Sequence, residues 1–237
     1  MVTPAVLQTG LRLFAHPFLT LGCKMRVGGY EHVRTASAHK KPIIFAANHV
    51  SEFDPIVVTN ALPWRTMFYV ALSRYDGSGV SWRGRFYGGR MFRALGAYPI
   101  LQGTHDYAKS LAYHLAILRA GKSMLIFPEG RIRRGRKDLP AHGGVTYLAE
   151  ATDALVVPVC INGAENISLK NVLRRRVRVD VAFAQPITAA ELFAGVAEND
   201  PDRYKKAASV IMRRVDSLVR VPSADTESTS VPETVRV

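Results

Sequence analysis

Two side chains that could do acid–base chemistry lie close together in the sequence, directly after an apolar run. His49 and Asp54 are five residues apart and follow the apolar residues 43–47. Residues five apart on an α-helix point about 140° away from each other, so these two can meet only across a turn. A histidine held by a carboxylate is a common general base. The spacing therefore predicts a base with an orienting partner at the edge of a sheet.

The residue after Asp54 indicates how this turn ends. Pro55 fits the first position of a helix, and its ring restricts Asp54 to non-helical backbone angles, which suit a helix cap. We expect the helix to run through residues 56–62 and to stop at Pro63. An alternative interpretation stays open at this point, in which Asp54 is only an N-cap and His49 is a hydrogen-bonded loop histidine.

A second polar motif follows another apolar run. Ser123–Phe127 is expected to form a strand, and it leads into Pro128, Glu129, Gly130 and Arg131. A carboxylate and an arginine just past a strand end lie where open α/β sheets usually bind ligands. Five of the seven residues from 131 to 137 are arginine or lysine. Such a run is most often a solvated loop, but its guanidinium groups could also bind a phosphate through paired hydrogen bonds.

The totals limit the classes of function. The chain has 237 residues, of which 48% are hydrophobic, so it can bury a substantial core, and one large domain is expected. Its 32 Lys and Arg exceed its 19 Asp and Glu, and the net charge of +13 predicts a negatively charged partner. Nucleic acid, anionic lipid and phosphorylated metabolites all qualify. The two cysteines, Cys23 and Cys160, suggest neither a disulfide framework nor a metal site, which suits a reducing compartment, and Cys160 is expected to be a buried thiol.

The hydrophobic pattern predicts an α/β fold with a mixed, largely parallel central sheet flanked by helices and an amphipathic N-terminal helical segment. The expected strands are Met25–Val33 with a bulge or turn at its two glycines, Ile43–Ala47, Thr66–Leu72, Ala97–Leu101, Ser123–Phe127, Leu155–Ile161 and Arg174–Phe183. The further expected helices are Thr104–Arg119 with Thr104 as cap, Gly143–Thr152 and Pro201–Val219. We expect residues 25–221 to form one domain and the tail, residues 222–237, to be disordered.

Residues 1–24 form the N-terminal segment. Its apolar stripe at helical spacing consists of Leu7, Leu11, Phe14, Phe18 and Leu21. Pro17 is expected to split the segment into two short helices, and no run of about 18 uncharged apolar residues is available to span a bilayer. No basic start typical of a signal peptide precedes the apolar residues. Two interpretations stay open, because the stripe could pack on the body of the protein or lie in a membrane surface.

Residues 74–93 are the least regular part of the chain and combine arginines and aromatic residues with five glycines. Aromatic rings and arginine stems suit the polar boundary of a membrane. They also suit single-stranded nucleic acid, whose bases stack on rings and whose phosphates bind arginine. A solvated helix face with ordinary core aromatics is the third interpretation.

Together, the two polar motifs resemble the first and third sequence blocks of the glycerolipid (lysophospholipid) acyltransferases, the superfamily of bacterial 1-acylglycerol-3-phosphate acyltransferase. The resemblance rests on residues 48–54 and 127–131, on the separation of the two motifs, and on Val157-Pro158-Val159, which is similar to the fourth block. It covers roughly residues 25–181. A His-x4-Asp motif alone is a weak signal, whereas its combination with Phe-Pro-Glu-Gly-Arg is specific.

The resemblance implies an O-acyltransferase of phospholipid biosynthesis. It would move a fatty acyl group from acyl-CoA or acyl carrier protein to a hydroxyl of 1-acylglycerol-3-phosphate or a similar lysolipid, without a metal or a cofactor beyond this co-substrate. His49 would be the general base, and Asp54 would hold its imidazole. The residues implied in substrate binding are Glu129, Gly130, Arg131, Asn48 and Ser51. Arg131 would bind the acceptor phosphate, and backbone N–H groups near Gly130 are a first guess for the donors to the thioester oxygen.

One position departs from the family pattern. Gln102 stands where the second block of the family usually has an arginine. If that arginine helps to hold the acceptor phosphate, either Arg131 and its basic neighbours replace it, or the acceptor is not a simple lysophosphatidate. The departure affects the choice of substrate and leaves the reaction class unchanged.

Two alternative functions follow from the same residues. One is an acyltransferase of the same superfamily with a different acceptor, such as a glycolipid or another lysophospholipid. The other is a basic, non-enzymatic nucleic-acid binder that uses residues 74–93 and 131–137, but no zinc spacing or RNA-recognition signature supports it, so no nucleic acid is expected as partner. The lipid substrates lead us to expect a cytoplasmic protein that lies peripherally on the anionic inner face of the cell membrane, with residues 1–24, residues 74–93 and the basic loops on one side.

Overall fold

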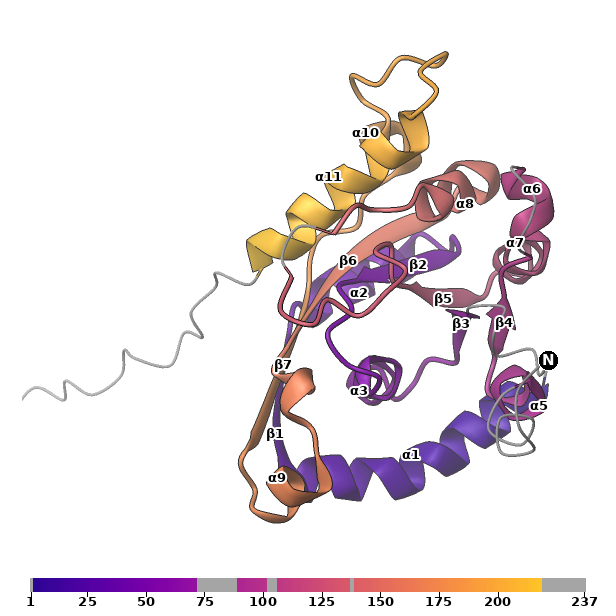
Figure 1. Ribbon diagram of the computed structural model, residues 1–237. Helices are drawn as coiled ribbons and strands as arrows, with labels where there is room; N and C mark the ends of the chain where they lie inside the picture. The colour runs from indigo at the N-terminus through magenta and orange to yellow at the C-terminus, as the bar shows by residue number, and fades with distance from the viewer. Residues whose placement is uncertain (1, 72–88, 102–105, 137–138, 219–237) are drawn as a thin grey trace, which may run out of the picture.

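A computed structural model describes residues 2–71, 89–101, 106–136 and 139–218 of the chain (Figure 1). The expectations for most of residues 74–93, for Gln102 and Thr104, and for the tail at 222–237 lie outside this described part.

A seven-stranded sheet forms the centre of the molecule, with the strand order β1-β7-β6-β2-β5-β3-β4. Neighbouring strands are parallel, except that β6 and β7 are antiparallel. The strands are β1 (Cys23–Gly28), β2 (Ile43–Ala47), β3 (Met67–Ala71), β4 (Ala97–Pro99), β5 (Ser123–Ile126), β6 (Leu155–Asn162) and β7 (Val177–Phe183). The expected α/β fold with a largely parallel sheet flanked by helices is confirmed.

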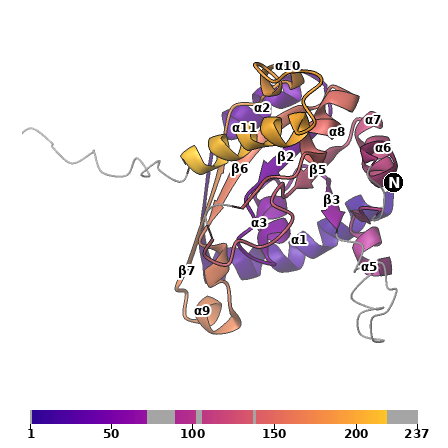
Figure 2. The same cartoon turned by 45° about the horizontal axis from the view of Figure 1, so that its top comes forward.

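Helices cover both faces of the sheet (Figures 1 and 2). One face is covered by α2 (Tyr30–Ala38), α3 (Asp54–Ala61), the short 3-10 helix η2 (Ala164–Asn166) and α9 (Leu169–Leu173), and α1 (Val2–Gly22) runs along the outside of this layer. The other face is covered by α6 (Tyr107–Ser110), α7 (Ala112–Arg119), α8 (Gly144–Thr152), α10 (Ala189–Leu192) and α11 (Arg203–Leu218). The helix α5 (Gly89–Ala94) packs beside β4.

The strand β2 explains why the functional motifs come together. All five of its residues are buried, with Ile43, Phe45 and Ala47 in one core and Ile44 and Ala46 in the other. A strand covered on both faces needs such an uninterrupted apolar sequence. Because β2 lies between β6 and β5, the segments that follow these three parallel strands meet at one edge of the sheet.

The N-terminal segment forms one continuous helix, so the prediction that Pro17 splits it is wrong. A proline removes one hydrogen bond from a helix interior, but tertiary contacts hold α1 on both sides of it. Gln8 is buried and donates to the backbone oxygens of Met67 (2.5 Å) and Leu95 (2.7 Å), and its own oxygen accepts from the Met67 N–H at 3.0 Å. Farther along, a Cβ at Gly22 would lie only 2.3 Å from Val172.

A polar side chain near the middle of α1 also binds the body of the protein. Arg12 donates to the backbone oxygens of Pro63 (2.5 Å) and Arg65 at the end of α3, whereas Leu7 and Leu11 of the expected apolar stripe are 41% and 38% exposed. The helix therefore packs on the body, as one of the two interpretations expects, and among its described side chains Gln8 and Arg12 form hydrogen bonds with it. No helix in the described part of the chain is both long and apolar enough to span a bilayer.

The expected strand Met25–Val33 is only partly correct. The strand β1 ends at Gly28, and α2 begins at Tyr30. Gly29 connects them with φ +80°, and a Cβ there would lie 2.1 Å from the Phe183 oxygen. Only glycine fits such a close approach in the left-handed region. The sequence did not predict α2, because only Val33 and Ala36 of this helix are buried, and its apolar residues therefore show little helical periodicity.

Two other element boundaries differ from the expectation. The helix expected over residues 104–119 consists of α6 and α7, which are separated at Leu111 by a backbone with φ −111°. Asp106 caps α6, since its carboxylate accepts from the N–H groups of the second and third helical residues. The strand β7 begins at Val177, because Arg175 and Arg176 close a turn by donating to the carbonyls of α9.

His114, on α7, is a fully buried histidine that should make the fold sensitive to acid. Burial lowers its pKa from 6.5 to about 4, although its hydrogen bond to the Tyr98 oxygen (3.1 Å) opposes this shift. The unfolded chain therefore binds a proton at His114 below pH 6.5, while the folded chain binds one only below about pH 4.

We expect protonation of His114 alone to lower the free energy of unfolding by about 3 kcal/mol as the pH falls from 6.5 to 4. Above pH 6.5, His114 should not affect the free energy of unfolding. The measurement is urea denaturation across this pH range for the wild type and for His114→Gln, which removes the titrating group but keeps a donor. Parallel pH curves of the two proteins would contradict the prediction.

Candidate active site

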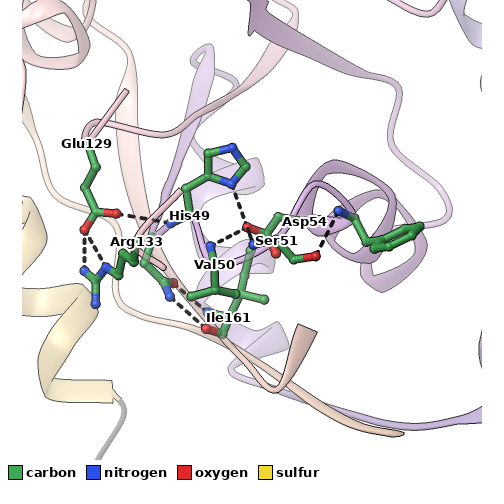
Figure 3. A network of polar contacts seen from close by, with 9 residues as sticks. His49, Val50, Ser51, Asp54, Glu129, Arg133 and Ile161 are labelled. Carbon is green, nitrogen blue, oxygen red and sulfur yellow. Dashed lines mark hydrogen bonds and ion pairs between the residues drawn. The ribbon is translucent and has the colours of Figure 1, made fainter. Parts of the chain in front are cut away.

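The candidate site lies at the edge of the sheet where β2, β5 and β6 end. The segment after β2 carries His49 and Asp54, and the segment after β5 carries Glu129 and the basic loop. The two polar motifs are far apart in the sequence, but the adjacent positions of β2 and β5 bring them together (Figure 3).

His49 and Asp54 meet across the turn, as their spacing predicts. His49 Nδ1 lies 2.7 Å from Asp54 Oδ2. The same oxygen accepts the N–H of Val50 at 2.7 Å and the N–H of Ser51 at 2.9 Å. Asp54 is completely buried, whereas the His49 side chain is 19% exposed. A buried carboxylate thus fixes both the backbone of the turn and one nitrogen of the imidazole.

The interpretation of Asp54 as only an N-cap is wrong. The helix α3 begins at Asp54 itself, with Phe53 as its N-cap residue and Pro55 in the first turn. The Asp54 side chain accepts no hydrogen bond from the N–H groups of its own helix. It accepts instead the N–H groups of Val50 and Ser51 in the preceding turn.

The imidazole ring of His49 is held in one orientation from two sides. It stacks on the Phe127 ring, with 4.2 Å between centroids and 17° between planes. Because Asp54 is an acceptor, the hydrogen of a neutral imidazole resides on Nδ1. Nε2 then carries the lone pair, and within the described part of the chain it has no hydrogen-bond partner. This arrangement leaves a base ready for a proton from a substrate.

Glu129 holds the backbone of His49. It is 1% exposed, and its Oε2 accepts the His49 N–H at 3.3 Å. Its Oε1 accepts from Arg133 Nε at 2.6 Å, and Arg133 Nη2 lies 2.5 Å from the same oxygen. The Arg133 N–H in turn donates to the His49 carbonyl at 2.7 Å. Both backbone groups of His49 are therefore bonded to this loop (Figure 3).

Arg133 also connects the site to the last helix. Its Nη2 lies 3.0 Å from Asp216 Oδ1 on α11. Burial lowers the pKa of Arg133, but its contacts with Glu129 and Asp216 outweigh burial and leave the pKa above its ordinary value. Nε and Nη2 of the guanidinium are thus bonded to two carboxylates, and the side chain serves the structure of the site.

The other expected site residues take different positions. Asn48 is 2% exposed, and its side chain exchanges two hydrogen bonds of 2.7 Å with the N–H and carbonyl of Ile161 on β6. Ser51 is half-buried, and its hydroxyl accepts the N–H of Phe53 at 3.3 Å. Asn48 therefore ties the segment after β2 to β6, while Ser51 lies in the turn between His49 and Asp54.

Gly130 and Arg131 lie on the solvent side of the site. Gly130 has φ +64°, and a Cβ there would be 3.0 Å from the His142 ring. Its N–H donates to the Phe127 carbonyl at 3.0 Å, so among the backbone N–H groups near Gly130 this one is already occupied. Arg131 is exposed and makes no hydrogen bond or ion pair with any other described residue.

Sequence reasoning missed Phe127 as the stacking partner of His49 and Arg133 as the partner of Glu129. For Arg133 a signal existed, because it lies four residues after Glu129, but four other cations surround it. The thiol of Cys160 is confirmed as buried, and burial raises its pKa to about 11, so it stays protonated. Among the described residues, no group of three or more His, Cys, Asp or Glu could hold a metal ion.

The fold and site define an α/β protein in which a histidine contacts a buried carboxylate at the carboxyl edge of a mostly parallel sheet. Residues 24–162, more than half of the chain, match the family model described as Acyltransferase. The chain belongs to this acyltransferase family.

A solved structure supports the same fold. The chain is similar to the crystal structure of the 1-acyl-sn-glycerophosphate (LPA) acyltransferase, PlsC, from Thermotoga maritima, with a TM-score of 0.59 and 21% sequence identity. The match covers 88% of this chain and 78% of that chain. At this level of identity the similarity establishes the fold.

The Glu129–Arg133 pair gives a test of how the site is held together. We expect Arg133→Ala to lower the free energy of unfolding by about 3 kcal/mol, because the buried Glu129 carboxylate loses its cation. Asp216→Ala removes the half-exposed partner and should cost less than about 1 kcal/mol. Urea denaturation of the two variants measures the difference. Equal losses would show that Glu129 does not depend on Arg133.

Proposed function

We propose that this protein is an O-acyltransferase that moves a fatty acyl group from a thioester, acyl-CoA or acyl carrier protein, to a hydroxyl of 1-acylglycerol-3-phosphate or a similar lysolipid. The observation that carries the proposal is the 2.7 Å contact between His49 Nδ1 and the buried Asp54, together with an exposed Arg131 that has no partner among the described residues. Membership of the acyltransferase family supports the reaction class.

In the proposed reaction, His49 Nε2 removes the proton of the acceptor hydroxyl while the oxygen attacks the thioester carbonyl carbon. The resulting imidazolium is stabilised by the Asp54 carboxylate at Nδ1. When the carbon–sulfur bond breaks, Nε2–H returns the proton to the leaving thiolate. The products are an ester and a free thiol, and the histidine ends in its starting state.

The negative charge that develops on the thioester oxygen needs hydrogen-bond donors. The N–H groups of Arg131 and Ile132 follow Gly130 in the same loop and have no acceptor within the described residues. The loop lies against His49 through the Arg133 N–H. We therefore assign the oxyanion role to Arg131 N–H and Ile132 N–H, in place of Gly130.

The proposed roles of the remaining residues follow from their contacts. Arg131 binds the acceptor phosphate, since it is the exposed arginine that follows Glu129 and Gly130 and has no partner among the described residues. Glu129 and Asn48 are positioning residues, because their polar atoms are occupied by His49, Arg133 and Ile161. An acceptor other than lysophosphatidate is the alternative that Gln102 keeps open. A panel of lysophosphatidate, glycerol phosphate, other lysophospholipids and glycolipids, with labelled palmitoyl and oleoyl thioesters, distinguishes these acceptors.

A bilayer location is part of the proposal. Lysolipid acceptors and their diacyl products partition into membranes, and the net charge of +13 favours an anionic surface. We propose that the protein works as a peripheral enzyme on the inner face of the cell membrane, with residues 25–221 as the transfer domain.

The role of His49 has a direct test. We expect His49→Ala to lower kcat by a factor on the order of 100 to 10,000, because the general base is lost, while the protein stays folded. Asp54→Asn should also lower kcat, since the amide no longer supports the imidazolium. Labelled-thioester transfer assays measure both effects. His39→Ala, an exposed histidine at the end of α2, is the matched control. Normal turnover by folded His49→Ala would rule out the mechanism.

The role of Arg131 is tested through the acceptor. Arg131→Ala should raise KM for lysophosphatidate about 10- to 100-fold, because a charged, paired hydrogen bond is lost. The KM for monoacylglycerol, which has no phosphate, should change little. Arg136→Ala is the control, as it removes the same charge from an exposed position in the same loop. If both variants raised KM for lysophosphatidate equally, the acceptor would be attracted by the general positive charge of the loop and not by a specific contact between Arg131 and the phosphate.

A further inference from the structure

The short helix α9 presents two leucines to solvent. Leu169 is 68% exposed and Leu173 is 74% exposed. They are four residues apart and therefore share one side of the helix. An adjacent side of the helix is fixed to the protein, because Val172, roughly 60° to 100° around the helix from the two leucines, is 4% exposed and packs against Gly22 at the end of α1. A rigid base thus supports an apolar surface that no described residue covers.

Cations surround these leucines. The exposed basic residues of this segment are Lys170, Arg174, Arg175 and Arg176. The turn after α9 has a defined backbone, since the N–H groups of Arg175 and Arg176 donate to the carbonyls of Val172 and Asn171 at 2.9 Å each. We call Leu169, Leu173 and these four basic residues the α9 patch.

A cationic hollow lies on the other face of the neighbouring strands β1 and β7, because its residues alternate with those that pack in the same core as α9. Lys24, Arg26, Arg178 and Asp180 line a hollow of about 280 Å³ on β1 and β7. These strands align Lys24 with Arg178 and Arg26 with Asp180. Three cations and one carboxylate line this hollow, so the strands beside α9 carry positive charge on this face as well.

The α9 patch lies on the same edge of the sheet as His49. The last residue pair of β6 and β7 is Asn162 with Asp180, so residues 177–179 continue beyond the end of β6. The helix α9 precedes this extension and lies at its far end, against the end of α1 (Figures 1 and 2). Because β6 is parallel to β2, this is the direction in which β2 leads to His49.

We propose that the α9 patch docks the protein on an anionic lipid bilayer, with Leu169 and Leu173 inserted at the boundary between headgroups and acyl chains and the arginines on lipid phosphates. Charge and apolarity together select this occupant, because a nucleic acid would leave the leucines in water, whereas a bilayer accepts both kinds of side chain. The inference deepens the proposed function and rests on it for its purpose, since a docked α9 would bring the His49 edge of the sheet toward its lipid acceptor.

The test is sedimentation of the full chain with vesicles of phosphatidylcholine alone and with added phosphatidylglycerol, at low salt. We expect Leu169→Ala/Leu173→Ala to weaken binding to the anionic vesicles at least tenfold, because two apolar side chains no longer insert. Arg174→Ala/Arg175→Asn/Arg176→Ala should weaken it about 100-fold, since each cation near an anionic surface contributes about a factor of five. Asparagine at 175 tolerates the φ of +52° found there.

The matched control removes three exposed cations from the opposite edge of the sheet, Arg34→Ala/Arg119→Ala/Lys122→Ala. It should bind vesicles like the wild type. Equal weakening by both triple variants, or unchanged binding after loss of the α9 leucines, would overturn the inference. Transfer to a soluble short-chain acceptor is measured in parallel and should be the same in the α9 variants and the wild type. Vesicle binding without any transfer would instead count against the proposed function alone.

Discussion

A single carboxylate oxygen, Asp54 Oδ2, organises the site. It accepts two backbone N–H groups and lies against the histidine nitrogen, all within 2.9 Å. The other oxygen, Oδ1, is buried without a hydrogen-bond partner among the described residues. The carboxylate is removed from water, so these three contacts must compensate for its desolvation. The turn, the helix start and the imidazole orientation are therefore parts of one interaction and would be lost together.

The sheet supplies the frame that this interaction needs. Because β2 is buried on both faces, it places the turn rigidly between the segments that follow β5 and β6. From one side Asn48 joins the turn to β6, and from the other Glu129 and Arg133 bond both backbone groups of His49. Most polar residues of the two motifs therefore form hydrogen bonds that fix the backbone at His49. The imidazole Nε2 and the Arg131 side chain have no partner among the described residues.

Much of this arrangement could be predicted from the sequence. The apolar runs at residues 43–47, 123–127 and 155–161 identified the central strands, because strands buried on both faces have uninterrupted apolar sequences. The five-residue spacing identified the contact between His49 and Asp54, because only a turn can join them. In both cases a local pattern reflects a strong physical requirement.

Other features could not be predicted because their causes lie far away in the sequence. The helix α2 depends on the approach of Phe183 to Gly29, and the continuity of α1 through Pro17 depends on Gln8, Arg12 and tertiary packing. The choice of Arg133 over its basic neighbours as the partner of Glu129 depends on where the loop crosses His49. No periodicity or propensity reports such contacts.

The ion pair between Arg133 and Asp216 has a consequence for the order in which the protein folds during its synthesis. The two residues are 83 positions apart, and Asp216 lies near the end of the last helix. The strands β2 and β5 are synthesised well before α11. The growing chain therefore contains both polar motifs before Asp216, the second carboxylate that binds Arg133, is available. The loop over His49 therefore gains its contact with Asp216 only after α11 has packed against β6.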